Sequence, residues 1–237
     1  MENQMKDTKA KVLFLKVGKV TITLLQNSKR KEMISGIKKY PVSNSFLTKT
    51  GFRDDEQGDL EHHGGENKAL FLFSSKTYEE INKQCNTNFK IDEVAHFGEN
   101  IILSNISESD VCVGDIYRLG EAKIQITQPR QPCWKLSANT TIKDMTKFIF
   151  QSGLTGWYAK VLYEGTICVS DELILEKRNY PNLSIKKLNQ LIVNPLLDEK
   201  ATQEALNCKE LGKPFFESLS KRYTLKEKDE QFSFYHT

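Results

Sequence analysis

The first part of the chain is dominated by short stretches in which apolar and polar side chains alternate. Val12 and Phe14 precede Gly18, and Ile22 and Leu24 follow it, each pair at the two-residue period of a strand with one buried face. Similar patterns recur over residues 32–42, 100–103, 116–119, 122–127, 157–163 and 172–177. Because these strands do not alternate regularly with helices, we expect a mainly β fold, with a closed or nearly closed β-barrel over residues 10–178.

Helical periodicity is sparse until Arg178. Residues 77–85 and 141–151 each predict a short helix, the second ending at Gly153. Beyond Arg178, three amphipathic patterns separated by prolines cover residues 184–193, 200–207 and 212–223. The sequence therefore predicts two domains: the β-barrel over residues 1–178 and a three-helix extension over residues 179–237.

Composition and charge exclude several classes of protein. The chain has 237 residues, a formal net charge of +3 and 38% hydrophobic residues, with a mean hydropathy of -0.50. No apolar run approaches the roughly 20 residues that span a bilayer, and the opening is too polar for a signal peptide. Charges of both signs are scattered along the chain, which predicts a cytoplasmic protein that binds neither nucleic acid nor membrane.

The cysteines indicate reduced thiols. There are five of them, an odd number, widely spaced and without the Cys-x-x-Cys spacing of structural zinc or dithiol redox sites. Four resemble the small buried hydrophobes that free cysteines usually become. The five are Cys85, Cys112, Cys133, Cys168 and Cys208.

Residues 43–68 have few large apolar side chains, and we expect a long irregular loop there, of the kind that carries function or moves. The loop contains Asp55-Glu56-Gln57 and then His62-His63-Gly64-Gly65. Two glycines allow a backbone to approach a ligand closely, as phosphate cradles require. A solvated acidic turn that ends in a glycine-rich bend explains the same residues, so both interpretations stay open.

A second polar cluster is His96-Phe97-Gly98-Glu99-Asn100, at the entrance to a strand. It would place the acid of Glu99 and the amide of Asn100 at a barrel mouth, although a plain turn has the same pattern.

A third cluster surrounds Cys133. Pro129 and Pro132 keep this backbone extended, and the positive charges of Arg130 and Lys135 favour a thiolate. A thiolate serves either as a nucleophile or as a soft metal ligand.

Each role of the thiolate has its own requirement. A cysteine hydrolase needs a histidine base, for which His62, His63 and His96 are available. A single thiolate supplies too few protein ligands for zinc, so a metal site would need further ligands from a cofactor.

Taken in order, these motifs resemble those of the MOSC-domain proteins of the YiiM type; the domain is named after the C-terminal part of molybdenum-cofactor sulfurase. The resemblance covers about residues 35–178, and the helical tail is similar to the extension of the same subgroup. Its most specific part is the run Pro129-Arg130-Gln131-Pro132-Cys133-Trp134. The other matching motifs are 55–57 with 62–65, 97–100, 113–115 and 155–158.

The resemblance implies a β-barrel related to that of the pyruvate kinase small domain. It also implies a molybdenum cofactor bound through Cys133, and a detoxifying reductase of N-hydroxylated compounds such as hydroxylaminopurine-type base analogues. Because the chain shows no flavin, haem or iron–sulfur motif, electrons would come from a separate reductase.

Matching positions give the expected roles. Cys133 is the metal ligand and redox centre, and Glu99 and His63 join it as catalytic candidates that could relay a proton. The cofactor contacts expected from the match are Arg130, Lys68, Gly64, Gly65, Asn100, His62, Ser35 and Lys38.

Two other functions fit the same residues. A carrier module would hold a persulfide on Cys133 or deliver the cofactor without turning over substrate. A metal-free hydrolase would form a covalent adduct on Cys133. The physiological substrate, the electron donor and the oligomeric state, including a homodimer, stay undecided at this level.

Overall fold

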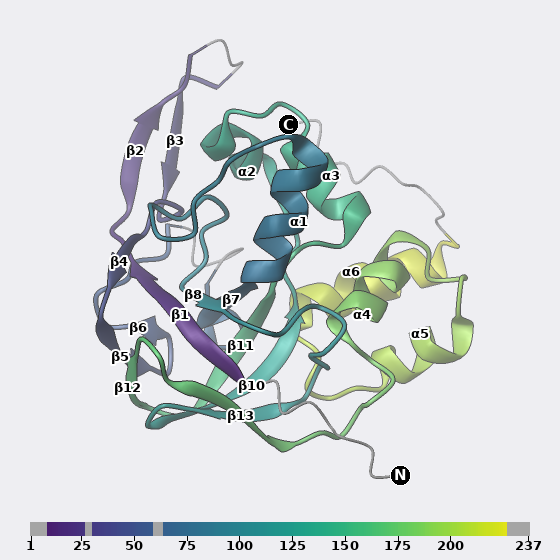
Figure 1. Ribbon diagram of the computed structural model, residues 1–237. Helices are drawn as coiled ribbons and strands as arrows, with labels where there is room; N and C mark the ends of the chain where they lie inside the picture. The colour runs from purple at the N-terminus through teal and green to yellow at the C-terminus, as the bar shows by residue number, and fades with distance from the viewer. Residues whose placement is uncertain (1–8, 27–29, 59–63, 227–237) are drawn as a thin grey trace, which may run out of the picture.

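The computed structural model of the chain describes residues 9–26, 30–58 and 64–226. Seven strands in the order β13-β9-β10-β11-β7-β8-β1 form a barrel that closes where β1 pairs with β13, and every neighbouring pair is antiparallel except β7 and β8 (Figure 1). This confirms the predicted mainly β barrel. The strands are β1 (Ala10–Val17), β7 (Leu70–Ser74), β8 (Ile101–Leu103), β9 (Ile116–Leu119), β10 (Ala122–Pro129), β11 (Trp157–Tyr163) and β13 (Glu172–Lys177).

The inside of the barrel is filled by apolar side chains of its strands. Leu15, Leu70, Ile124 and Trp157 have no exposed surface and belong to one continuous cluster of buried side chains. Phe14 was expected to share a face with Val12, but the pairing register shifts between them, and Leu15 lies inside instead. A closed barrel has no free edge along which another strand could pair. Its packed interior therefore leaves the ends of the strands as the place for a site.

The expectation of a single irregular loop over residues 43–68 is wrong. β5 (Asn44–Thr48) and β6 (Gly51–Phe52) form a small sheet with β12 (Gly165–Cys168), and β4 (Tyr40–Val42) pairs with β1. Residues 66–68 form a short 3-10 helix, η1 (Glu66–Lys68). The pairing between β5 and β12 joins distant parts of the chain, which local patterns do not reveal.

The strand expected over residues 32–42 is interrupted. β3 (Glu32–Ser35) pairs with β2 (Thr21–Leu24) in a hairpin that projects from the barrel, whereas β4 belongs to the barrel sheet (Figure 1). Met33 and Ser35 of the hairpin are buried, while Ile22, Leu24 and Ile34 are exposed. The chain turns between β3 and β4 at Gly36, where any side chain would collide with the Glu56 carbonyl.

Helices cover one end of the barrel. α1 (Ser75–Cys85) begins at Ser74, whose hydroxyl accepts hydrogen bonds from the backbone of its first turn. The helix expected over residues 141–151 corresponds to α3 (Met145–Ser152), which begins four residues later than predicted. α2 (Trp134–Thr140) was not predicted, and it ends where Thr141 adopts a left-handed conformation with φ 58°. α3 ends at Gly153, as predicted.

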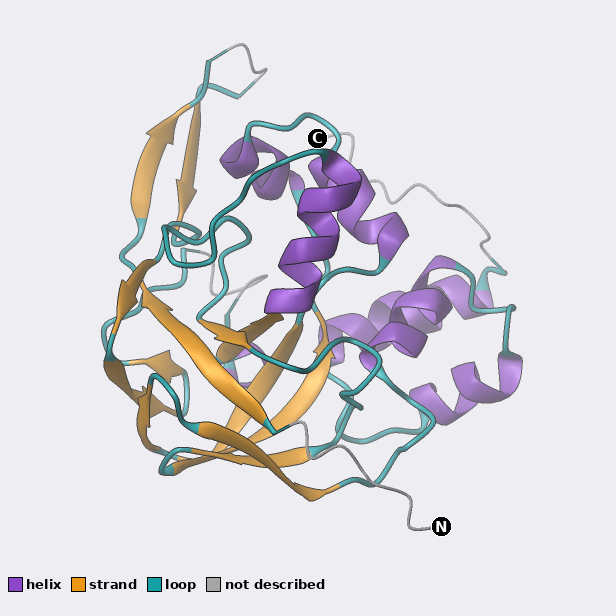
Figure 2. Cartoon of the chain, in the orientation of Figure 1, coloured by secondary structure: helices purple, strands orange, loops and turns teal. Residues whose placement is uncertain are grey.

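The three C-terminal helices lie within a residue or two of their predicted positions and gather on the side of the barrel (Figure 2). They are α4 (Ile185–Val193), α5 (Glu199–Leu206) and α6 (Lys213–Thr224). They share a cluster of buried side chains to which Val113 and Phe150 also contribute. The Gly212 amide donates to the carbonyl of Thr127 on β10. The division into two domains stays a prediction.

Candidate functional site

An open pocket lies where several strands and loops end, with about 630 Å³ of empty space that includes solvent at its mouth. Part of its lining comes from residues 35–39, 55–58 and 97–100. The rest comes from Lys68, Phe71, Arg130, Cys133, Lys135 and Tyr158, while Lys38 and Glu99 within the ranges just given do not line the pocket. The sequence motifs that looked separate, around positions 55, 98 and 130, therefore meet at one place.

The backbone on both sides of Cys133 is fixed, and this brings Cys133 to the pocket. The segment after β10 passes through Pro132. Cys133 is the residue directly before α2, and its backbone is extended, with φ −130° and ψ 172°. Its carbonyl accepts hydrogen bonds from the Leu136 amide and the Thr146 hydroxyl, each at 2.9 Å. The side chain is half-buried and lines the pocket, as the sequence interpretation requires.

Three cationic side chains besides Lys39 share the pocket with the thiol. Arg130, on the segment that follows β10, places its guanidinium 5.8 Å from the centre of the Phe71 ring. The Lys68 ammonium lies 5.9 Å from the ring centre of Tyr158. Lys135 donates to the carbonyl of Ile34 at 3.0 Å. We call Lys68, Arg130, Cys133, Lys135 and Tyr158 the thiol group; its charge suits an anionic ligand.

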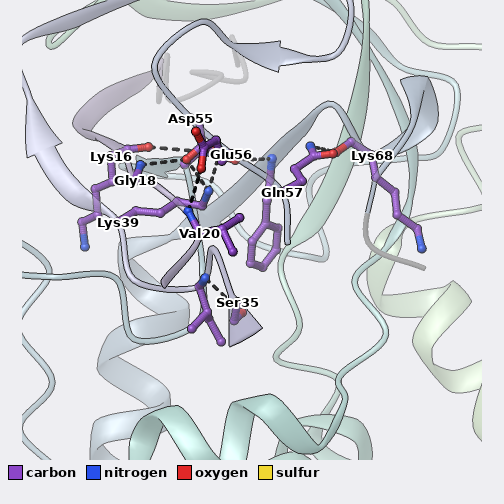
Figure 3. A network of polar contacts seen from close by, with 12 residues as sticks. Lys16, Gly18, Val20, Ser35, Lys39, Asp55, Glu56, Gln57 and Lys68 are labelled. Carbon is purple, nitrogen blue, oxygen red and sulfur yellow. Dashed lines mark hydrogen bonds and ion pairs between the residues drawn. The ribbon is translucent and has the colours of Figure 1, made fainter. Parts of the chain in front are cut away.

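A second set of lining residues forms hydrogen bonds and an ion pair among its own members. Both carboxylate oxygens of Asp55 accept from the Lys39 ammonium, and Asp55 also accepts from the Gly18 amide at 2.8 Å and the Asn100 side chain at 2.9 Å (Figure 3). Burial lowers the pKa of Lys39, against the opposing effect of the Asp55 charge. We call Lys39, Asp55 and Asn100 the braced group, since their charges and amides are used within the protein.

Asn100 is the centre of this bracing. Its side-chain oxygen accepts from the Phe71 amide at 3.3 Å, and its nitrogen donates to the Lys16 carbonyl at 3.2 Å as well as to Asp55. It therefore joins β7, β1 and the segment after β6. Asn100 was expected to contact a cofactor; it does line the pocket, but its amide is committed to protein partners.

Neighbours of Asp55 extend the bracing. Glu56 accepts from the Val20 amide at 2.9 Å and pairs with Lys19 at 3.3 Å, and the hydrogen bond from Val20 lowers its pKa. Gln57 donates to the Lys68 carbonyl at 3.2 Å (Figure 3). The Asp-Glu-Gln motif thus fixes the backbone that carries Lys68.

Glu99 does not line the pocket, contrary to its expected place on the substrate side. It has no exposed surface, and it accepts from Lys16 at 2.8 Å, from the Tyr78 hydroxyl at 2.7 Å and from the Phe97 amide at 3.1 Å. Burial, followed by the charge of Glu99, raises the pKa of Tyr78 well above its ordinary value. The Glu99 carboxylate is therefore used for contacts inside the protein.

The remaining predicted residues divide into three cases. Ser35 lines the pocket, with its hydroxyl accepting from the Ile37 amide at 3.2 Å. Lys38, Gly64 and Gly65 are not among the lining residues; Lys39 takes the place expected of Lys38, and the glycines precede the short helix that carries Lys68. His62 and His63 lie outside the described residues.

Sequence reasoning missed the aromatic lining. Phe71, Phe97 and Tyr158 line the pocket, and the rings of Phe71 and Tyr158 are 5.0 Å apart with 35° between their planes. On a strand, such residues have the pattern of ordinary core positions. Two of the three, Phe97 and Tyr158, belong to the motifs at residues 97–100 and 155–158, and these motifs were the only sequence signal for them.

The donor set fits a molybdenum cofactor. Within the described ranges no three His, Cys, Asp or Glu side chains gather in a way that would hold a metal ion. One thiol faces an open pocket lined by four cationic side chains, of which Lys39 pairs with Asp55, and together these suit a soft metal carried by an anionic, phosphate-bearing pterin.

Comparison with known proteins decides the family. The family model of the MOSC domain matches residues 59–174. The uncharacterized protein YflK of Bacillus subtilis is 33% identical over 222 residues, which cover 92% of this chain and 96% of that protein. Protein YiiM of Escherichia coli is 30% identical over 200 residues, which cover 84% and 88% of the two chains. The chain is a MOSC-domain protein of the YiiM type.

A solved structure agrees with this assignment. The crystal structure of YiiM from Geobacillus stearothermophilus superposes with a TM-score of 0.72 at 29% identity, covering 90% of this chain and 98% of that chain. This MOSC-domain chain is also similar to a protein named reductase from Gibberella moniliformis, at 31% identity over 148 residues. That match covers 62% of this chain and only 26% of the fungal protein. In the part of the chain that the structure describes, no helix is long and apolar enough to cross a membrane.

Proposed function

We propose that this MOSC-domain protein is a molybdenum-cofactor-dependent reductase of N-hydroxylated compounds, with hydroxylaminopurine-type bases as its substrate class. The observation that carries the proposal is the presence of one cysteine thiol in an open pocket with four cationic side chains and an aromatic lining. The similarity to a protein named reductase supports the reaction class.

The residues of the thiol group have separate tasks. Cys133 would be the protein's ligand to the metal, since a thiolate is the soft donor that the pocket offers. Arg130, Lys68 and Lys135 would hold the anionic parts of the cofactor by charge-assisted hydrogen bonds. When bound, the cofactor would supply two-electron redox chemistry.

The aromatic side chains form the apolar part of the pocket. Phe71 and Phe97 are almost completely buried behind it, at 4% and 1% exposure, so they form a rigid apolar wall that keeps the lining in shape. The reaction consumes two electrons and two protons, converts the N-hydroxyl compound to the amine, and releases water. The electrons would come from a separate donor protein, since the chain carries no motif for a second redox group.

The test compares protein from two hosts. The chain is produced in cells that make the molybdenum cofactor and in cells in which cofactor synthesis is blocked. Metal content is measured by elemental analysis, and reduction of 6-hydroxylaminopurine is followed with reduced viologen as electron donor. We expect molybdenum and reduction only in protein from the competent cells.

Other outcomes separate the alternatives. Molybdenum or a persulfide on Cys133 without any reduction would favour the carrier module. Protein that is free of molybdenum from both hosts but forms a covalent adduct on Cys133 would favour the hydrolase. Either result would refute the proposed reductase.

A further inference from the structure

Tyr158 stands out among the pocket residues because its ring is held by its neighbours while the residue lines the pocket. The ring is 9% exposed and is held between Phe71, at 5.0 Å between ring centres, and the Lys68 ammonium at 5.9 Å. Its backbone carbonyl accepts from the Thr127 hydroxyl at 3.1 Å, within the pairing of β10 and β11. The phenol is thus held on a rigid strand and lines the pocket that contains Cys133.

Arg130 limits where the Tyr158 hydroxyl proton can point. Burial raises the pKa of the Tyr158 phenol, while the charge of the Arg130 guanidinium, together with hydrogen bonding, has a smaller opposing effect. Arginine has no acceptor, so the phenol cannot donate its proton to Arg130. Because Tyr158 lines the pocket that contains Cys133, its hydroxyl can donate to a molecule bound there.

Other acidic groups of the pocket are poor donors. Asp55 accepts from three protein partners, and Glu56 accepts from Lys19 and the Val20 amide, so the protein already uses their oxygens as acceptors. A carboxylate accepts hydrogen bonds and donates none. Burial raises the pKa of Tyr158, and the charge of Cys133 adds to this while Arg130 opposes it. The phenol therefore keeps its proton through the neutral range.

We propose that the Tyr158 hydroxyl donates a hydrogen bond to the oxygen of the substrate's N–O group. This inference rests on the proposed reductase function and deepens it. The bond that breaks is N–O, the two electrons come from the external donor, and the two protons from solvent complete the amine and water. A hydrogen bond to oxygen stabilises the negative charge that builds there as N–O breaks. Arg130 acts through Tyr158 as a positioning residue.

The test is the variant Tyr158→Phe, which keeps the ring and removes the hydroxyl. Tyr163→Phe is the matched control, since Tyr163 is 67% exposed and does not line the pocket. Molybdenum content, kcat and KM for 6-hydroxylaminopurine with reduced viologen are measured, together with the inhibition constant of adenine, the amine product. Adenine lacks the oxygen but presents the same ring to the pocket.

We expect Tyr158→Phe to retain its molybdenum and its adenine inhibition constant and to lose about a hundredfold in kcat/KM, while Tyr163→Phe matches the native protein. Unchanged kcat/KM would overturn the proposal. Equal weakening of adenine and substrate would also overturn it, since Tyr158 would then act through its ring, and loss of molybdenum would reassign it to the cofactor. If the native protein holds molybdenum but reduces nothing, the proposed function itself fails, and this inference fails with it.

Discussion

The braced group and the thiol group line the same pocket, yet their polar atoms have opposite uses. In the braced group, Asp55 and Asn100 have their hydrogen bonds taken up by protein partners. In the thiol group, Cys133 and Tyr158 present side chains to the pocket. Both groups come from motifs of similar polarity in the sequence. Counting where each hydrogen bond goes therefore separates residues that hold a site in shape from residues that act in it.

The strongest test of this comparison is Cys133→Ser. A hydroxyl is a harder and weaker ligand than a thiolate, and changing residues that merely support a metal ligand already costs about 10–100-fold, so loss of the ligand itself should cost more than about a hundredfold in reduction. Thermal unfolding should be little affected. The matched control is Cys168→Ser, on β12 at an exposed position. Full activity in Cys133→Ser would mean that the thiol group is misassigned.

Glu99→Gln tests whether Glu99 stabilises the interior of the protein instead of acting in the pocket. It leaves the fully buried Lys16 ammonium without its counter-charge, and breaking such a pair costs about 3–5 kcal/mol of unfolding free energy. Urea denaturation measures the loss, with Glu79→Gln on the exposed face of α1 as control. The fraction that folds and binds the cofactor should turn over normally. A stable variant with impaired turnover would restore Glu99 as a catalytic residue.

Lys68→Ala tests whether the cations hold the cofactor. A hydrogen bond to a charged group contributes about 1.5–3 kcal/mol, so we expect the cofactor to bind roughly ten- to a hundredfold more weakly. Molybdenum retained during dialysis gives the measurement, and Lys76→Ala, at an exposed position of α1, is the control. Equal retention in both variants would show that Lys68 has another task.

The smallest expected effect concerns His96, which lies between the rings of Phe89 and Tyr78. Burial lowers the pKa of His96 from 6.5, so the folded protein favours neutral imidazole. This contribution to stability is complete above pH 6.5 and is lost as pH falls through the folded-state value. His96→Phe should therefore flatten the pH dependence of unfolding below 6.5. An unchanged slope in denaturant titrations would contradict this.

The barrel was predictable because its strands alternate, as in Trp157–Tyr163, and because the helices after Arg178 carry amphipathic patterns. The pairing of β5 with β12 was not, since it depends on contacts between distant segments. α2 was missed because the segment after Cys133 lacks a clear apolar period and ends at the left-handed Thr141.

The candidate site was predictable in part. Cys133, Arg130, Lys68 and Ser35 line the pocket as expected, because their motif marks them as polar residues on rigid or glycine-rich segments. Glu99 was misplaced, since sequence polarity does not tell whether a carboxylate faces solvent or a buried lysine. Tyr158 was missed as a site residue for the converse reason: an aromatic residue on a strand has the pattern of the core.

The contact between Gly212 and β10 ties the helical extension to the strand that leads toward Cys133. The Gly212 amide donates to the Thr127 carbonyl, and a side chain at position 212 would collide with that of Gln128, two residues before Arg130. A chain that lacked Gly212 and the helix after it would lose this hydrogen bond and leave the end of β10 uncovered.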